Sequence, residues 1–326
     1  MYVEAAICDY LREEILPQIA PAPYGDIEMT KLAAQKPVCL FLEKKTNIMV
    51  VGKLFKWGAV PLEEAWLEAN KEYSNLKLLR QQLEMDGDTD RVVAPLGKKR
   101  ELSALLVTEM VPGQTLDYYI TQAIFERQHK ELFQSLRHLA RFFLKLHESA
   151  KTDRPLSPEL PRLYLNTLLD SLNGELLDSS KRLEIEKYTS RWWGEEKVFA
   201  LDKETIVHGD ATPTNFLFDK ERVTAIDLES MKWADRCWDL GFIAAELKHH
   251  FMWRMGDGLA AEPFIGHFLW EYAVNYGDNY FFEIITRRLP LYMALGLLRI
   301  ARNLYVGDAH RESLILEAKR CLKYGL

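Results

Sequence analysis

The residues best suited to chemistry lie in one segment, residues 206–240, which carries three groups of polar residues in order. Carboxylates and one amide dominate these groups, and short apolar runs separate them. A carboxylate can take a proton from a reacting hydroxyl, and carboxylate and amide oxygens are ligands that Mg²⁺ accepts. The groups are His208-Gly209-Asp210 with Asn215, then Ile226-Asp227-Leu228-Glu229, then Asp235 with Asp239.

Phosphoryl transfer is the chemistry that this set suits best. The transferred group carries dispersed negative charge, so catalysis depends mainly on positioning and electrostatic stabilisation. Asp210 suits the role of the base that orients the acceptor hydroxyl and takes its proton. Asn215 and Asp227 suit a Mg²⁺ site, because one carboxylate and one amide oxygen suffice for this ion. The spacing from Asp210 to Asn215 equals that of the catalytic loop of protein kinases.

The elements that must position these residues are short strands on one side and helices on the other. Two β-rich runs across a short polar link predict a hairpin, and a proline followed by acids predicts the start of a helix. An apolar stripe at helical spacing supports that helix. The expected elements are strands at 37–43 and 47–55, a helix at 61–83 with Trp66, Ala69, Tyr73, Leu76 and Leu83 on its apolar face, and a strand at 102–110.

After a turn at residues 111–114 the pattern becomes mainly helical. Helices are expected at 126–149 and 163–193, with a break near 173–174, and through most of the chain after residue 240. Residues 151–161 are Pro-rich and are expected to form a loop. A smaller half with strands thus precedes a larger helical half, which predicts an α+β protein.

The segment 206–240 resembles the aminoglycoside phosphotransferase and choline kinase family of small-molecule kinases. HGDATPTN, IDLE and DRCWDL match the family's signature element by element. The resemblance implies a bilobal protein-kinase-like fold, with an N-terminal nucleotide-binding lobe at 1–110, a hinge at about 109–115 and a C-terminal catalytic and acceptor-binding lobe at 116–326. It also implies ATP or GTP and Mg²⁺ as cofactors, and a small-molecule hydroxyl acceptor of the aminoglycoside, choline, sugar or amino-alcohol type.

Further residues take their expected roles from this resemblance. Lys53 resembles the phosphate-binding lysine, and Glu72 the helical glutamate that pairs with it, with Glu68 as the competing residue. His208 and Asp239 are expected to support the catalytic loop rather than to react, and Asp235 suits either role. The backbone of the hinge is expected to meet the nucleobase at Glu109, Met110 and Val111.

One departure from the family keeps a second hypothesis open. Residues 26–38 contain no glycine, although a glycine-rich loop is expected to cover the phosphates there. Ala33 and Ala34 are candidates to replace it, because their backbone N–H groups can still approach a phosphate. The alternative is a catalytically degenerate nucleotide-binding or scaffold protein. The hypothesis of a protein kinase is less well supported, because Gly209 replaces the catalytic-loop arginine and residues 227–239 leave no room for an activation loop.

Composition sets the remaining expectations. The 326 residues carry a formal charge of −6 and 48% hydrophobic residues, which is typical of a globular protein and not of one that binds nucleic acid. The four cysteines are scattered and predict neither a zinc site nor disulfides. No stretch approaches the ~18 apolar residues of a membrane span, and the first residues do not resemble a signal peptide. A cytoplasmic protein without membrane partners is expected, and the oligomeric state is not predicted.

Overall fold

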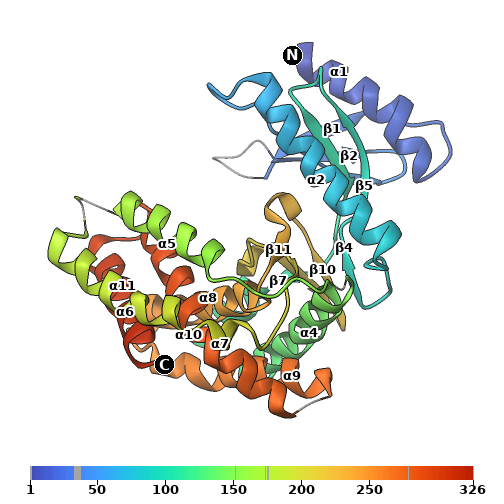
Figure 1. The fold of residues 1–326 in the computed structure, drawn as a ribbon. Helices are drawn as coiled ribbons and strands as arrows, with labels where there is room; N and C mark the ends of the chain where they lie inside the picture. Colours follow the sequence, from blue (N-terminus) through green and yellow to red (C-terminus); the bar gives the residue numbers. More distant parts are fainter. Residues whose placement is uncertain are drawn as a thin grey trace. The chain divides into compact units, whose positions relative to one another are not determined.

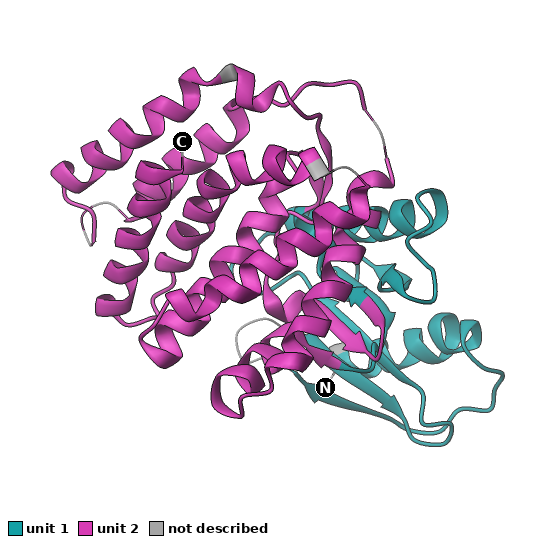
Figure 2. Cartoon of the chain, turned by 90° about the horizontal axis from the view of Figure 1, so that it is seen from below, with its two compact units in different colours: residues 1–113, 224–230 teal, residues 114–223, 231–326 magenta. Residues whose placement is uncertain are grey.

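The computed structural model describes residues 2–32, 38–150, 152–172, 174, 176–277 and 279–325. The chain divides into two compact units, coloured separately in Figure 2. Unit 1 comprises Met1–Gly113 and Thr224–Ser230, and unit 2 comprises Gln114–Val223 and Met231–Leu326. The segment Thr224–Ser230 therefore groups with the N-terminal residues, although it follows them by more than a hundred positions in the chain.

Unit 1 begins with helical turns and continues into a β-sheet that carries one long helix, α2 (Figure 1). Pro61 precedes α2, and Glu63 and Glu64 lie in its first turn, where acidic side chains are favoured. The elements are α1 (Tyr2–Tyr10), η1 (Leu11–Ile15), η2 (Leu16–Gln18), β1 (Ile27–Lys31), β2 (Val38–Glu43), β3 (Met49–Leu54), α2 (Leu62–Gln82), β4 (Asp90–Val92), β5 (Pro95–Lys99), β6 (Leu105–Glu109) and η4 (Leu228–Ser230).

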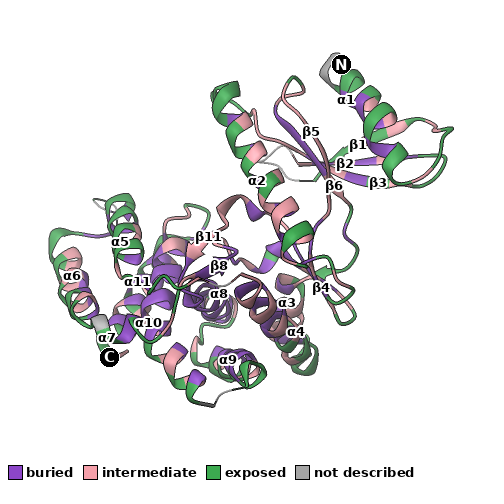
Figure 3. Cartoon of the chain, turned by 45° about the vertical axis from the view of Figure 1, so that its right-hand side comes forward, coloured by how far each residue is buried: buried purple, intermediate pink, exposed green. Residues whose placement is uncertain are grey.

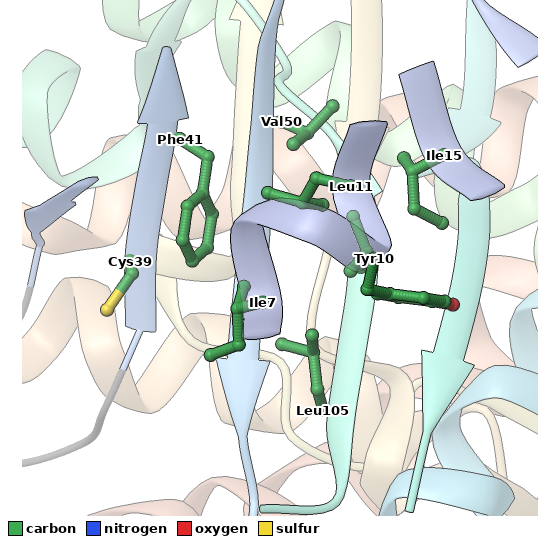
Figure 4. Close-up of a cluster of buried hydrophobic side chains, with 9 residues drawn as sticks. Ile7, Tyr10, Leu11, Ile15, Cys39, Phe41, Val50 and Leu105 are labelled. Atoms are coloured by element: carbon green, nitrogen blue, oxygen red, sulfur yellow. The ribbon is translucent and has the colours of Figure 1, made fainter. Parts of the chain in front are cut away.

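The five-stranded sheet of unit 1 has the order β1-β2-β3-β6-β5, with antiparallel neighbours. Side chains alternate between the two faces of a strand, so Val50 and Lys53 of β3 point to opposite faces. Val50 joins a buried apolar cluster that α1 and η1 cover (Figure 4). Lys53 therefore faces away from this cluster. The cluster consists of Ile7, Tyr10, Leu11, Ile15, Cys39, Phe41, Val50, Leu105 and Val107.

The buried face of α2 differs from the apolar stripe expected from the sequence. Ala69 and Leu76 are buried as expected, whereas the aromatic rings of Trp66 and Tyr73 are only partly buried. The other buried positions are Ala65, Glu72 and Leu79, at spacings of three and four residues. The buried face is thus made of two alanines, two leucines and one glutamate, and the aromatic residues lie at its border.

Unit 2 is mainly helical, and its described residues form four short strands, β7, β8, β9 and β11. A further strand, β10, begins in unit 2 at Arg222 and Val223. Its elements are β7 (Gln114–Thr115), α3 (Leu116–Phe125), α4 (His129–Glu148), α5 (Glu159–Leu172), α6 (Ser179–Gly194), α7 (Glu196–Phe199), β8 (Thr205–Val207), η3 (Pro213–Asn215), β9 (Phe216–Asp219), β10 (Arg222–Ala225), β11 (Lys232–Ala234), α8 (Cys237–Met255), η5 (Leu259–Ala261), α9 (Glu262–Tyr276), α10 (Asn279–Ala301) and α11 (Asp308–Tyr324).

Helix α8 forms the centre of unit 2. Every residue from Cys237 to Phe251 is buried, as the purple ribbon in Figure 3 shows. The helix packs mainly against α10, which in turn packs against α11, while α4 packs against α9. Because α8 is buried on all sides, its polar side chains must find partners inside the protein.

The helix expected at 126–149 is confirmed as α4, but the sequence did not predict the separate helix α3 that precedes it. Arg127, with φ of 59°, lies between the two helices. One predicted boundary in unit 2 is wrong. Helix α5 begins at Glu159, within the segment expected to be a loop, because Pro161 is compatible with a first helical turn. Within the described residues, no helix combines the length and the apolar composition that crossing a membrane requires.

Candidate functional site

The loop after β8 in unit 2 presents Asp210. Strand β8 ends at Val207 and is followed by His208, whose side chain is fully buried. Gly209 adopts φ of 83°, a left-handed conformation that glycine accepts without strain. This conformation turns the chain sharply between a buried histidine and a partly exposed aspartate. The local backbone therefore favours glycine at position 209, between the buried His208 and Asp210.

Asp239, in the first turn of α8, holds this loop in place. Its carboxylate accepts hydrogen bonds from the backbone N–H groups of His208 (2.7 Å) and Gly209 (3.0 Å), and its Oδ2 lies 3.1 Å from Nε2 of His147. Burial alone would raise the pKa of Asp239, but the hydrogen bonds from the His147 ring and from the Gly209 N–H keep the pKa below its ordinary value. Asp239 is thus an ionised, fully buried anchor of the loop.

His147 is fixed as a neutral ring on the other side of Asp239. Burial lowers the pKa of His147, with the Asp239 carboxylate opposing this change. Since ionised Asp239 can only accept, Nε2 of His147 donates to it, and Nδ1 accepts from the hydroxyl of Tyr272 at 2.9 Å. Asp235, in contrast, is bound by Arg288 at 2.6 Å and caps the N–H of Cys237, so its role is structural.

A tight turn brings Asn215 back to Asp210. The N–H of Thr212 donates to the carbonyl of Asp210 (2.8 Å), and the N–H of Asn215 donates to the carbonyl of Thr212 (3.0 Å). The amide nitrogen of Asn215 then donates to the carbonyl of Asp210 at 3.0 Å and lies 3.4 Å from its Oδ2. The nitrogen faces Asp210, so the amide oxygen is the atom of Asn215 that suits a cation.

Two residues without a sequence signal complete the surroundings of Asp210. Arg299 of α10 donates through Nη2 to Oδ1 of Asp210, and its Nη1 lies 3.4 Å from Oε1 of Glu246 on α8. Burial raises the pKa of Glu246 to about 7, with Arg299 opposing and Asp210 and Asp117 adding to the rise. One guanidinium thus bridges two carboxylates, one of which titrates near neutral pH.

The raised pKa of Glu246 predicts a pH-dependent stability. Between its ordinary value of 4.5 and about 7, the unfolded chain has lost the proton that the folded chain retains. Stability therefore falls as the pH rises through this window, by about 3 kcal/mol for a shift of this size. Glu246→Gln removes the titrating group, so we expect the wild type to lose stability relative to this variant from pH 4.5 to 7.5, measured by urea unfolding at each pH.

The matched control for this prediction is Glu221→Gln, which replaces an exposed glutamate of the same unit. Its stability is expected to follow that of the wild type at every pH. A constant difference between the wild type and Glu246→Gln across the same range would show that Glu246 does not titrate there.

In unit 1, Lys53 is the centre of a cluster of carboxylates. Its Nζ donates to Glu72 at 2.8 Å, to Asp227 at 2.6 Å and to Glu229 at 2.7 Å. Burial alone would lower the pKa of Lys53, but the three carboxylates outweigh burial and raise it above its ordinary value. The competing residue Glu68 is exposed on α2, one turn before Glu72. Lys53 is therefore a charged, partly buried group.

Helix α2 and the segment Thr224–Ser230 position the three carboxylates. Glu72 occupies a buried position of α2, and burial raises the pKa of its carboxyl, with Lys53 opposing. The amide of Asn75, also on α2, donates to the carbonyl of Leu228 at 2.8 Å and so ties the segment to the helix. Asp227 adopts φ of 63°, an unusual conformation for a residue other than glycine and one that occurs at functional sites.

The cluster has a composition that suits a divalent cation. Single carboxylate oxygens of Glu72, Asp227 and Glu229 lie within 4.8 Å of one another. Hard oxygen ligands of this kind are those that Mg²⁺ prefers. Lys53 is also a cation, and it pairs with all three carboxylates. Glu229, which lies in the motif IDLE, had no assigned role from the sequence.

The predicted hinge segment follows β6 at the end of unit 1. The N–H of Glu109 donates to the carbonyl of Ala94 at 3.0 Å, and its carboxylate accepts from the N–H of Ala94 at 2.8 Å. Glu109 is thus already bound to the neighbouring chain segment. Met110 is 36% exposed and Val111 is buried. Ala33 and Ala34, the candidates to replace the glycine-rich loop, lie outside the described residues.

Comparison with known families gives one match. The family model described as "Phosphotransferase enzyme family" matches residues 61–274, about two thirds of the chain. This range includes Glu72, the loop of Asp210 and Asn215, and Asp227. No relative was found among curated protein sequences.

Several solved structures have a similar fold. The ternary complex of APH(2'')-IIa with streptomycin and ATP has a TM-score of 0.60 at 14% identity, over 96% of each chain. The macrolide 2'-phosphotransferase MphH from Brachybacterium faecium has a TM-score of 0.53 at 16% identity, over 96% of this chain and 97% of that chain. For the Plasmodium vivax ethanolamine kinase the TM-score is 0.55 at 12% identity, over 92% and 81%. The predicted α+β, protein-kinase-like fold is thus confirmed.

Proposed function

Because this chain belongs to the phosphotransferase enzyme family, we propose that it transfers the γ-phosphoryl group of ATP or GTP to a hydroxyl of a small-molecule acceptor, with Mg²⁺. The observation that carries the proposal is the loop of unit 2, in which Asp210 is presented by a turn that Asn215 and Asp239 hold. The bound ligands of similar proteins support a nucleotide, since one holds ATP and another GDP.

Asp210 acts as the general base of this reaction. The acceptor oxygen forms a bond to the γ-phosphorus, the bond from that phosphorus to the bridging oxygen of the diphosphate breaks, and the hydroxyl proton passes to Asp210. Arg299 binds Oδ1 of Asp210, which assigns the proton to Oδ2. The leaving group is the nucleoside diphosphate.

Lys53 binds the phosphates, and Glu72 keeps its Nζ in position. The backbone groups that meet the nucleobase are those of Glu109, Met110 and Val111, except the N–H of Glu109, which is already bound to Ala94. Asp227 offers a carboxylate and Asn215 an amide oxygen, and both are groups that Mg²⁺ accepts as ligands. When bound, this ion would neutralise part of the negative charge of the phosphates.

The test of the proposal is a thermal-shift assay with Mg²⁺, ATP and GTP, alone and in combination, followed by acceptor screening. A nucleotide at about 100 times its dissociation constant stabilises the folded protein by about 2.7 kcal/mol. We expect a shift that requires both Mg²⁺ and one nucleotide, and phosphoryl transfer to a hydroxyl compound. Binding without transfer to any acceptor would favour the degenerate nucleotide-binding protein, and no shift at all would contradict a nucleotide-dependent activity.

Substitution of Glu72 tests its role as the partner of Lys53. Without this carboxylate, Asp227 and Glu229 remain to attract Nζ, and the lysine is held less well for a phosphate. A lost hydrogen bond to a charged group costs about 1.5–3 kcal/mol, so we expect Glu72→Gln to raise KM for the nucleotide by at least about tenfold. Steady-state kinetics with the nucleotide as the varied substrate measures this effect.

Glu68→Gln is the matched control, because Glu68 is an exposed glutamate on the same helix. Its KM for the nucleotide is expected to equal that of the wild type. A larger increase of KM for the nucleotide in Glu68→Gln than in Glu72→Gln would identify Glu68 as the partner of Lys53.

A further inference from the structure

Two arginines lie at the end of α10, and the proposed phosphoryl transfer uses only one of them, Arg299, as a partner of Asp210. Arg299 lies in the last turn of α10, and Arg302 follows the helix directly, with its N–H bound to the carbonyl of Arg299 at 3.4 Å. Residues three apart on a helical turn project to the same side. Arg299 contacts Asp210 and Glu246, so this side of α10 belongs to the surroundings of the proposed base.

Arg302 carries a donor that is not satisfied. Its Nε is buried, and no atom among the described residues accepts a hydrogen bond from it. A guanidinium offers five N–H donors in a fixed plane and no acceptor, so only acceptor oxygens can satisfy it. A buried donor without a partner costs about 1–3 kcal/mol. Its natural complement is a carboxylate or a phosphate, which binds a guanidinium through two parallel hydrogen bonds.

Tyr164 of α5 adds a third donor to this region. Burial raises the pKa of its hydroxyl, with the charges of Arg299 and Arg302 opposing and that of Asp210 adding to the rise. The Phe242 ring connects Tyr164 with Arg299, since its centre lies 6.3 Å from the centre of the Tyr164 ring and 5.6 Å from the guanidinium of Arg299. The Tyr164 ring packs against Trp238, with ring centres 5.1 Å apart, and this contact limits its movement.

The charges of the region favour an anion over a cation. Arg299 is shared between Asp210 and Glu246, whereas Arg302 forms no ion pair with any described residue. A cationic acceptor would meet Arg302 as a like charge beside the base. An oxyanion would accept a hydrogen bond from the buried Nε of Arg302, and Asp210 would stay available for the acceptor hydroxyl.

From this geometry we infer that the acceptor carries an oxyanionic group, a carboxylate or a phosphate, in addition to its hydroxyl. Arg302 and the hydroxyl of Tyr164 bind this group beside Asp210, and Arg299 flanks it. The inference rests on the proposed function and adds the class of acceptor to it. Arg302 is thereby a specificity-determining residue.

The inference is tested with acceptors that differ only in the anionic group. The pairs are D-glycerate and glycerol, glycerol 3-phosphate and glycerol, and L-serine and ethanolamine, with kanamycin as a polycation. Transfer from ATP and from GTP is measured with Mg²⁺. We expect kcat/KM to be at least about tenfold higher for the anionic member of a pair, the first and second pairs distinguishing carboxylate from phosphate. Preference for the uncharged members or for kanamycin would overturn the inference.

Variants test whether Arg302 causes the preference for anionic acceptors. Arg302→Met is expected to lower kcat/KM for the anionic member at least about tenfold more than for its uncharged partner, and Arg302→Lys to restore part of the difference. Arg162→Met, which replaces an exposed arginine of α5, is the control and is expected to leave the preference intact. An equal loss for both members of a pair in Arg302→Met would also overturn the inference.

A binding measurement separates this inference from the proposed function. Titration calorimetry with D-glycerate and with glycerol 3-phosphate, in the presence of Mg²⁺ and ADP, does not depend on turnover. Binding by the wild type that is lost in Arg302→Met supports the anion site even if no compound is phosphorylated. The absence of binding, or equal binding by both proteins, contradicts the site even where Mg²⁺-dependent transfer to other acceptors is observed.

Discussion

Asp210→Asn is expected to reduce turnover by about 10²- to 10⁴-fold, the range that general-base catalysis contributes. Each factor of ten corresponds to about 1.4 kcal/mol of transition-state stabilisation. The amide has nearly the same shape as the carboxylate and can still accept from Arg299, so the loop is expected to keep its structure. The lost property is the ability to take the proton of the acceptor hydroxyl.

Two measurements are needed for this variant. Initial rates of nucleoside diphosphate release give the loss of turnover, and the Mg²⁺-dependent thermal shift with the nucleotide is expected to remain as in the wild type. Asp170→Asn, which removes an exposed aspartate paired with Arg182, is the control for the loss of one carboxylate. Unchanged turnover in Asp210→Asn would exclude Asp210 as the base, and a lost nucleotide shift would indicate a wider structural effect.

Asp227→Asn is expected to reduce turnover by a comparable factor, about 10²- to 10³-fold, through a different step. A neutral amide is a weaker ligand for Mg²⁺ than a carboxylate, so we expect the nucleotide thermal shift to require at least about tenfold more Mg²⁺. Asparagine tolerates the left-handed backbone that Asp227 adopts, and the segment is therefore expected to fold as before.

Glu229→Gln is the control variant for Asp227→Asn. Glu229 also accepts from Lys53, at 2.7 Å, so its substitution removes a similar charge from the same lysine. If the two variants require the same excess of Mg²⁺, Asp227 has no special role: either the charge around Lys53 causes the effect, or both carboxylates bind the ion. A normal Mg²⁺ requirement in Asp227→Asn would exclude it as a ligand altogether.

The strands and helices that the sequence predicted well are those with strong local signals. The hairpin of β2 and β3 follows from two β-rich runs and a short polar link, and α2 follows from Pro61 and its acids. Strand β5 has no such signal, because Pro95–Lys99 contains a glycine and two lysines and is ordered by pairing with β6. The boundary between α3 and α4 depends on a single left-handed residue, Arg127, which no pattern indicates.

The choice between Glu68 and Glu72 shows what lies beyond local patterns. Both residues are one turn apart on α2, and either could serve as a helical glutamate. Only the packing of α2 in unit 1 decides that Glu72 is buried beside Lys53 while Glu68 faces solvent. The contact of Asp227 and Glu229 with the same lysine likewise depends on the return of Thr224–Ser230 to unit 1.

The amino-acid sequence by itself indicated the family of the chain, because its motifs are short and local. It also predicted that Asp210 and Asn215 share one short loop, because the turn that joins them is local. The tertiary structure alone decided what surrounds that loop. Three helical regions far apart in the chain supply these surroundings, through Tyr164, Glu246, Arg299 and Arg302. Their spacing in the sequence does not predict that they meet, because only the packing of the helices brings them together. The reason is physical: short turns constrain neighbours in the sequence, whereas burial and charge pairing constrain neighbours in space.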